Sequence, residues 1–193
     1  ITDELHFAPL GVFVTADLSR DHRHADLEII SEIVNAGEGD AVAEISLTVL
    51  DPSGRKVAQA ASPISIKAGQ EQAITSGLKL EEPRLWSVDS PTLYQLKAAV
   101  SVNHNRVDEV VTSFGVRSIL FDPDLGFLLN GKPLKIKGTS NHQDHAGVGV
   151  AVPDSLFEFR IRKLKEMGAN AWRCAHNPPA PAFLDACDRL GMM

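Results

Sequence analysis

Hydrophobic and polar residues alternate along much of the first 115 residues. Ala25 and Leu27 are interleaved with charged residues, and similar runs recur at 45–49 and 96–102. This period-two alternation is typical of β-strands that have one buried face and one solvated face. About seven such runs, separated by turn signals, predict an immunoglobulin-like β-sandwich over residues 1–115.

After residue 115 the pattern changes to strands that alternate with helices. Residues 134–138 predict a short strand, and residues 170–174 predict a second one. Two successive strand–helix units indicate a parallel sheet with crossover helices. A complete barrel takes about 250 residues, so residues 116–193 are predicted to hold the first two βα units of a truncated (β/α)8 TIM barrel. We therefore expect the chain to be a piece of a longer protein.

The two predicted helices have recognisable ends. The first begins just before Ser155, which has the spacing of a capping box with Glu158, and it stops at Gly168. The second begins at Pro181 and stops at Gly191. Each helix has an apolar stripe that we expect to be buried, made of Phe157, Ile161 and Leu164 in the first and of Phe183, Cys187 and Leu190 in the second.

The composition excludes several classes of protein. Of the 193 residues, 44% are hydrophobic and 23% are charged, which is typical of a globular protein with a packed core and not of a disordered one. No apolar run approaches the roughly 18 residues of a membrane span. The net charge of −6 argues against a nucleic-acid partner, because such binding needs a basic surface. No targeting segment is recognised at the start of the chain, so both a cytoplasmic and an exported location stay open.

Polar side chains follow both predicted barrel strands at their carboxyl ends. His142, Asp144 and His145 lie in the loop after the first strand, and Arg173 and His176 lie at the end of the second. Because the functional residues of a barrel gather at this edge, the two clusters are candidates for one site. Three interpretations stay open: hydrogen bonding to a polyhydroxylated ligand, metal binding through His and Asp, and a structural role in capping the strand ends.

Other chemically distinctive residues are interpreted as structural. Trp86 and Tyr94 place two aromatic rings near one loop of the predicted sandwich, where we favour packing over a carbohydrate platform. Cys174 and Cys187 lie on predicted barrel elements, and they cannot form a disulfide framework. We interpret both as thiols of the core.

Residues 170–178 read Asn-Ala-Trp-Arg-Cys-Ala-His-Asn-Pro, which resembles the first signature of glycoside hydrolase family 2. That family includes β-galactosidases, β-mannosidases and β-glucuronidases. Its architecture would make this chain an immunoglobulin-like domain followed by the opening of a catalytic TIM barrel. The resemblance extends to residues 85–87, 91–94, 114–117, 127–133, 137–145 and 183–193.

The resemblance implies a retaining exo-β-glycosidase, with β-galactosidase as the leading specificity and a β-linked carbohydrate as the substrate. Members use two glutamates on later barrel strands, one as acid/base and one as nucleophile, with carboxyl groups about 5–5.5 Å apart. After residue 115 the glutamates are Glu158 and Glu166, both on the first predicted helix. We therefore expect no catalytic residue in this chain, and no activity from this part alone.

Four residues are expected from the resemblance to bind substrate. Arg173 and His176 match residues that contact the sugar in the −1 subsite, and Asp144 matches a position that reads sugar hydroxyls. His142 matches a rim residue of the same loop, whereas Asn177 stands where the signature commonly has Tyr. No metal or cofactor is expected in this part, although the galactosidase branch often uses Mg²⁺ and Na⁺ in the full-length enzyme.

Two other function classes stay open from the sequence. One is a non-catalytic carbohydrate-binding or inter-domain spacer module. The other is a metal-dependent barrel hydrolase that would use His142, His145 and His176. A homo-oligomer is compatible with each of these hypotheses.

Overall fold

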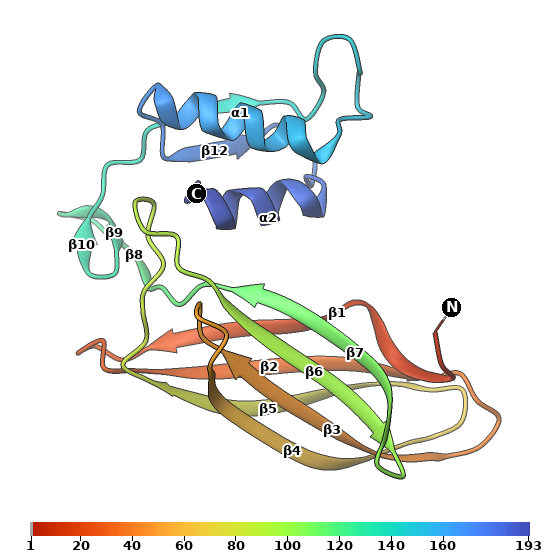
Figure 1. Ribbon diagram of the computed structural model, residues 1–193. Coiled ribbons are helices and arrows are strands. Elements are labelled where there is room, and N and C mark those ends of the chain that lie inside the picture. Colours follow the sequence, from red (N-terminus) through yellow and green to blue (C-terminus); the bar gives the residue numbers. More distant parts are fainter. Residues whose placement is uncertain (1) are drawn as a thin grey trace. The chain divides into compact units, whose positions relative to one another are not determined.

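The computed structural model describes residues 2–193, and the chain forms two compact units (Figure 1). The first unit comprises the chain up to Arg84 together with Leu93–Val116. The second comprises Arg117–Met193 together with Leu85–Thr92, a segment that leaves the first unit between two of its strands. Neither of the two helices in residues 2–193 has the length and apolar composition needed to cross a lipid bilayer.

The first sheet of the first unit has three antiparallel strands. They are β1 (Leu5–Leu18), β2 (His24–Asn35) and β5 (Glu71–Glu81), in the order β1-β2-β5. β2 is central, and its side chains alternate between buried and less buried positions along its whole length. This is the alternation that the sequence predicts around Ala25 and Leu27, which are 0% and 2% exposed.

The second sheet of this unit has four antiparallel strands. They are β3 (Ala41–Leu50), β4 (Lys56–Ile66), β6 (Tyr94–Val102) and β7 (Asn105–Phe114), in the order β4-β3-β6-β7. Its central strands β3 and β6 have one apolar face with exposures of 0–1% at six positions, and these are Ile45, Leu47, Val49, Leu96, Ala98 and Val100. Each sheet therefore contributes one apolar face to the core, and burial of that area is the main force that stabilises the unit.

Tyr94 belongs to this core. It is 4% exposed, its ring stacks on Phe114 with centroids 5.7 Å apart, and its hydroxyl accepts a hydrogen bond from the Arg84 amide at 2.8 Å. Trp86 is 2% exposed and lies in the second unit, where its indole N–H donates to the carbonyl of Asp188 at 2.8 Å. Both rings are packed, as predicted, because neither has a face open to a sugar.

The second unit begins with a small antiparallel sheet and continues into alternating strands and helices. The small sheet contains β8 (Ile119–Asp122), β9 (Gly126–Leu129) and β10 (Lys132–Pro133). Strands β11 (Gly138–Asn141) and β12 (Ala171–Cys174) then pair in parallel. Helix α1 (Asp154–Glu166) connects them, and α2 (Pro181–Leu190) follows β12.

The strand predicted at residues 134–138 is misplaced, because β11 starts only at Gly138. The side chain of Asn170 holds the preceding segment, since it accepts from the Lys137 amide at 2.8 Å and donates to the Lys135 carbonyl at 3.0 Å, and the Asn170 amide also donates to the Lys137 carbonyl at 2.8 Å. The alternation of apolar residues before Gly138 suggested a strand there, whereas the backbone pairing runs through the polar residues after it.

The predicted capping box of Ser155 and Glu158 is also wrong. Pro153 is the N-cap residue of α1 and no side chain caps the helix, so Ser155 lies inside the first turn. Both predicted helix stops are confirmed. Gly168 and Gly191 have φ of +89° and +72°, which only glycine adopts readily.

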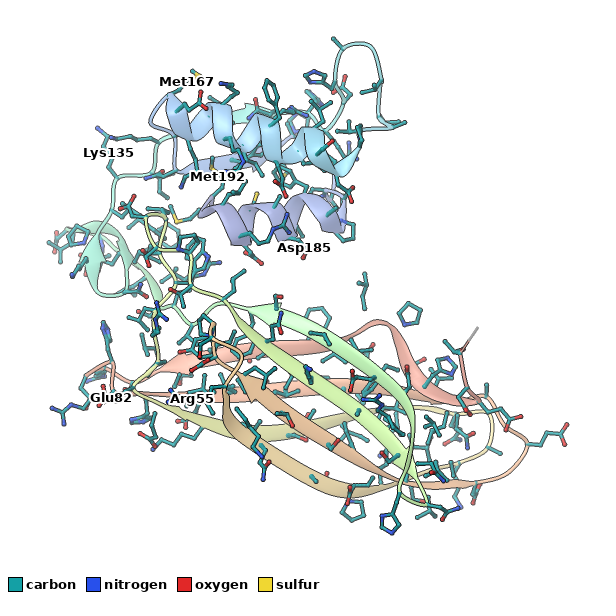
Figure 2. All side chains as sticks on the ribbon, in the orientation of Figure 1. Arg55, Glu82, Lys135, Met167, Asp185 and Met192 are labelled. Carbon is teal, nitrogen blue, oxygen red and sulfur yellow. The ribbon has the colours of Figure 1, made fainter. Side chains whose placement is uncertain are left out.

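The two helices share one core with β12. Phe157 and Ile161 of α1 and Phe183 of α2 are at most 4% exposed, and the Phe157 and Phe183 rings lie 5.7 Å apart between centroids. Trp172 of β12 packs on Phe183 at 4.9 Å. Figure 2 shows the side chains of this unit, with the exposed Met167 labelled after α1 and the exposed Asp185 labelled on α2.

The turn between β3 and β4 is organised by one carboxylate. Asp51 accepts hydrogen bonds from the amides of Ser53 and Arg55 at 2.9 and 3.0 Å and from the Ser53 hydroxyl at 2.6 Å. The guanidinium of Arg55 donates to its second oxygen at 3.2 Å. These donors, led by the Ser53 hydroxyl, lower the pKa of Asp51 from 3.8 to about 2.

We expect Asp51→Asn to lower the stability of the chain in a pH-dependent way. A carboxylate with a lowered folded-state pKa stabilises the fold above its unfolded pKa of 3.8, and that stabilisation is lost as the pH falls through the folded value. The difference in melting temperature from wild type should be largest near pH 7 and should shrink between about pH 4 and 2. Glu44→Gln, on β3 away from the turn, is the control; a difference for Asp51→Asn that does not change with pH would contradict this account.

Candidate functional site

The carboxyl ends of β11 and β12 meet at one edge of their sheet. The two strands are parallel and in register, with Asn141 opposite Cys174, and the Ala175 amide donates to the Asn141 carbonyl at 3.0 Å. The loops that follow both strands therefore start side by side. Each loop contains one of the histidines singled out by sequence, His142 and His176.

The structure brings these two histidines together. Their ring centroids are 5.7 Å apart, with the ring planes at 80°. Both side chains are exposed, and the peptide bond between Ala175 and His176 is cis. An imidazole both donates and accepts hydrogen bonds, so the pair offers two adjustable polar groups to a ligand.

Asp144 lies on the same loop as His142, and both residues line one open hollow. The hollow has a volume of about 360 Å³, and its lining is His142, Gln143, Asp144, Val150 and Asn177. It presents one imidazole, one exposed carboxylate, two side-chain amides and one aliphatic group. Such a mixture suits a small polar ligand that combines hydroxyl groups with apolar C–H faces.

Arg173 is held on the sheet and is not among the residues that line this hollow. It lies on β12 opposite Ser140 of β11, and its guanidinium donates to the Ser140 hydroxyl at 2.8 Å. The Arg173 side chain is exposed. A guanidinium has five N–H donors, so this contact leaves further donors for a ligand.

A residue that sequence reasoning missed holds the loop in place. Arg160 of α1 donates to the backbone carbonyls of His142 and Gln143 at 2.8 Å and, at 3.4 Å, to that of Asp144. Its guanidinium lies 4.8 Å from the centre of the Trp172 ring. Burial lowers the pKa of Arg160, while the negative charge of Asp144 acts in the opposite direction; an arginine stays protonated under either influence.

The sequence did contain a signal for Arg160. It lies three residues after Phe157 and beside Ile161, so its position on the helix is within the predicted apolar stripe. A charged residue on a buried stripe needs partners, because an unpaired buried charge is costly. Those partners are backbone carbonyls and one aromatic face.

A second, smaller cavity adjoins the open hollow, and Gln143 and Asn177 line both. Its volume is about 30 Å³, and Arg160, Trp172 and Cys174 are among its lining residues. The open hollow is larger and carries two of the residues singled out by sequence, His142 and Asp144, so it is the candidate ligand site.

The two cysteines differ in their surroundings. Cys187 is 7% exposed, and burial raises the pKa of its thiol to about 12, with the nearby Asp188 and Cys174 acting in the same direction. Cys174 is half-buried, and burial raises its pKa too. Within residues 2–193, no three or more His, Cys, Asp or Glu side chains come together in a way that could hold a metal ion.

Two family models together match nearly the whole chain. The model of "Glycosyl hydrolases family 2" matches residues 6–117, and that of "Glycosyl hydrolases family 2, TIM barrel domain" matches residues 123–193. The strand ends described above fall within the second of these matches.

Individual relatives cover this chain from end to end. A β-galactosidase of Bacteroides ovatus is 37% identical over 100% of the chain, and a β-glucuronidase of Bacteroides fragilis is 31% identical over 100%. A crystal structure of a glycosyl hydrolase family 2 member from Bacteroides cellulosilyticus superposes with a TM-score of 0.93 at 34% identity, over 100% of the chain. The chain spans only 22%, 28% and 26% of these three proteins, respectively.

We expect the two thiols to react at different rates in the folded chain. The thiolate is the reactive form, so at pH 8 a maleimide should label the buried Cys187 at least about tenfold more slowly than Cys174. Peptide mapping by mass spectrometry measures both rates, and Cys174→Ser isolates the slow one. Denaturant should make the rates equal; equal rates without denaturant would show that Cys187 is not shielded as described.

Proposed function

Because this chain belongs to glycosyl hydrolase family 2, we propose that the full-length protein is a retaining exo-β-glycosidase and that its preferred substrate is a β-galactoside. The observation that carries the proposal is the hollow lined by His142 and Asp144 at the carboxyl ends of two parallel strands. In barrel enzymes this is the edge where substrates bind.

We further propose that residues 1–115 are an immunoglobulin-like domain and that residues 116–193 are the first two βα units of a truncated TIM barrel. The sheet orders β1-β2-β5 and β4-β3-β6-β7 support the first assignment, since both sheets are antiparallel and each buries one face. The parallel pair β11 and β12, joined through α1 and followed by α2, supports the second.

The proposed substrate contacts use the chemistry of each side chain. Asp144 accepts hydrogen bonds from sugar hydroxyls, Arg173 donates to oxygen atoms, and His142 and His176 do either. Exposure of all four side chains supports this role, because none is sealed in the core.

A neutral sugar fits the hollow better than a sugar acid. The lining of the hollow includes the carboxylate of Asp144 and no Lys or Arg. A glucuronide carries its own carboxylate, which would be repelled by Asp144 at short range. The charge of the hollow's own lining favours a galactoside over a glucuronide, whereas Arg173, the proposed contact outside that lining, would attract a glucuronide carboxylate, and both activities occur in the names of relatives.

We assign the two-glutamate mechanism to residues beyond this chain. Glu158 forms ion pairs with Arg162, at 3.6 Å, and with Arg189, and Glu166 pairs with Lys163 at 2.7 Å. Both glutamates lie on α1 and not at the strand ends. Glycosidic cleavage needs two carboxyl groups on either side of the scissile bond, about 5–5.5 Å apart in a retaining enzyme. The ion pairs give Glu158 and Glu166 a structural role instead.

The 193-residue chain alone should not hydrolyse β-glycosides. It lacks a candidate pair of catalytic carboxylates, so nitrophenyl β-galactoside and nitrophenyl β-glucuronide should both remain intact in its presence. The full-length protein is the positive control for each substrate. Turnover by the purified chain above the buffer rate would refute the assignment of both glutamates to other parts of the protein.

In the full-length protein, Asp144→Ala and Arg173→Ala should each lower kcat/KM for a β-galactoside about 100-fold or more, because hydrogen bonds to the sugar strengthen in the transition state. Arg20→Ala, at an exposed arginine of the first unit, is the control and should be neutral. A variant of Asp144 or Arg173 that stays within about threefold of wild type would remove that residue from the site.

A further inference from the structure

We propose that Arg160 is a positioning residue that sets the geometry of the substrate-binding loop from the helix behind it. The segment concerned is residues 142–144, which carries His142 and Asp144. This inference rests on the proposed function, because it assigns Arg160 a role in the activity of that site. It concerns a residue that does not line the open hollow.

Several hydrogen bonds from the loop converge on the side chain of Arg160. Three successive carbonyls, those of His142, Gln143 and Asp144, face the guanidinium of Arg160, at 2.8, 2.8 and 3.4 Å. Carbonyls of an extended segment point alternately to opposite sides. Three that turn toward one group force the loop to curl around it, and this curl determines where the intervening side chains project.

Arg160 is itself held in place by an aromatic ring of the core. Its guanidinium lies 4.8 Å from the centre of the Trp172 ring, and Trp172 packs on Phe183 in the core at 4.9 Å. A planar cation over an indole ring is a favourable arrangement that also restricts rotation of the side chain. The loop is therefore tied to β12 and to the core of the unit through one residue of α1.

The same loop has a second attachment, to the start of α2. The side-chain oxygen of Gln143 accepts a hydrogen bond from the Ala180 amide at 2.8 Å, at the start of α2. The backbone of Gln143 is bonded to Arg160, and its side chain is bonded to α2. Both helices thus hold the residue between His142 and Asp144, so the separation of these two side chains is set by the helices.

Lysine could not fully replace Arg160. An ammonium group is a compact point donor, whereas the guanidinium donates along several directions in one plane and stacks on an aromatic ring. Arg160→Lys would keep the charge and part of the hydrogen bonding. Arg160→Met would keep the aliphatic stem and lose both the charge and the donors.

The test uses the full-length protein and begins with a measurement that does not depend on activity. Hydrogen exchange followed by mass spectrometry reports on peptides that cover residues 141–145 and Ala180. Arg160→Met should raise exchange in both peptides, whereas Arg162→Met, two residues further along α1 at an exposed position, should not. Unchanged exchange in Arg160→Met would overturn the proposal.

The kinetic test asks whether Arg160 acts through the loop. Arg160→Met should lower kcat/KM for a β-galactoside about 10- to 100-fold, because small misplacements of binding groups are costly in rate. Arg160→Lys should recover part of that loss. When Asp144→Ala is already present, adding Arg160→Met should lower kcat/KM by less than about threefold, because the effects of residues that act as a unit are not additive. A full multiplicative loss would show a general structural effect and would contradict positioning.

Failure of this inference is distinguishable from failure of the proposed function. If the wild-type protein hydrolyses no β-glycoside, the proposed function is wrong, and hydrogen exchange alone decides whether Arg160 orders the loop. If Arg160→Met does not fold, Arg160→Lys is compared with Arg162→Lys by the same two measurements. In that comparison, positioning would be contradicted if Arg160→Lys left hydrogen exchange unchanged, or if it left kcat/KM unchanged. It would also be contradicted if Arg160→Lys and Asp144→Ala lowered kcat/KM multiplicatively in the double variant.

Discussion

The parallel pairing of β11 with β12 is the constraint on which the candidate site depends. It requires a very close approach of two backbones, because a Cβ on Gly138 would lie 2.6 Å from the carbonyl oxygen of Ala171. Real Cβ atoms do not come that close, so glycine at this position makes the register accessible. The register then sets Asn141 opposite Cys174, and both following loops emerge at one edge. His142 and His176 meet for this reason, although 34 positions separate them in the sequence.

A two-stranded parallel sheet cannot hold that edge in place without help from its surroundings. Parallel strands are stable when helices cover them, and α1 and α2 supply the apolar side chains that do so. Phe157 and Phe183 form the contact between the helices, and Trp172 joins it from β12. Arg160 lies against Trp172 and holds the carbonyls of the loop. The packing that stabilises the unit therefore also restrains, through Arg160, the loop that carries residues proposed to bind a sugar.

Sequence pattern predicted the elements whose signal lies in side-chain periodicity. The alternation around Leu27 and the stops at Gly168 and Gly191 are confirmed, and the apolar stripes of both helices are buried except at Leu164 and Leu190, which are partly buried. The grouping of His142 with His176 also followed from sequence, because the carboxyl ends of parallel strands share an edge. Substrate binding by these residues stays a prediction.

The errors share one physical cause, which is that backbone hydrogen bonds leave little trace in sequence. The strand was placed before Gly138 because apolar residues alternate there, whereas backbone pairing continues through Thr139 and Ser140. Ser155 has the spacing of a cap, but helix α1 starts two residues earlier than that spacing requires. Arg160 was missed because its partners are carbonyls, which every residue has. Side-chain patterns therefore predicted which face of each helix or strand is buried better than they predicted where its backbone hydrogen bonds begin.

The segment Leu85–Thr92 shows a further effect of backbone partners, because it lies between two strands of the first unit and packs with the second. Trp86 donates to the Asp188 carbonyl at 2.8 Å, and the Lys165 ammonium donates to the carbonyls of Val88 and Gly191 at 2.8 and 2.9 Å. A Cβ on Gly191 would overlap the Val88 carbonyl, so the segment also fits closely against the end of α2. Removing it would take away the Trp86 donor to the Asp188 carbonyl and one of the two carbonyl acceptors of the half-buried Lys165 ammonium, and a buried polar group left without its partner costs about 1–3 kcal/mol. The second unit is therefore complete only with Leu85–Thr92, which Leu93–Val116 separates from the rest of that unit in the sequence, so a division of the sequence at residue 115 would separate groups that depend on one another.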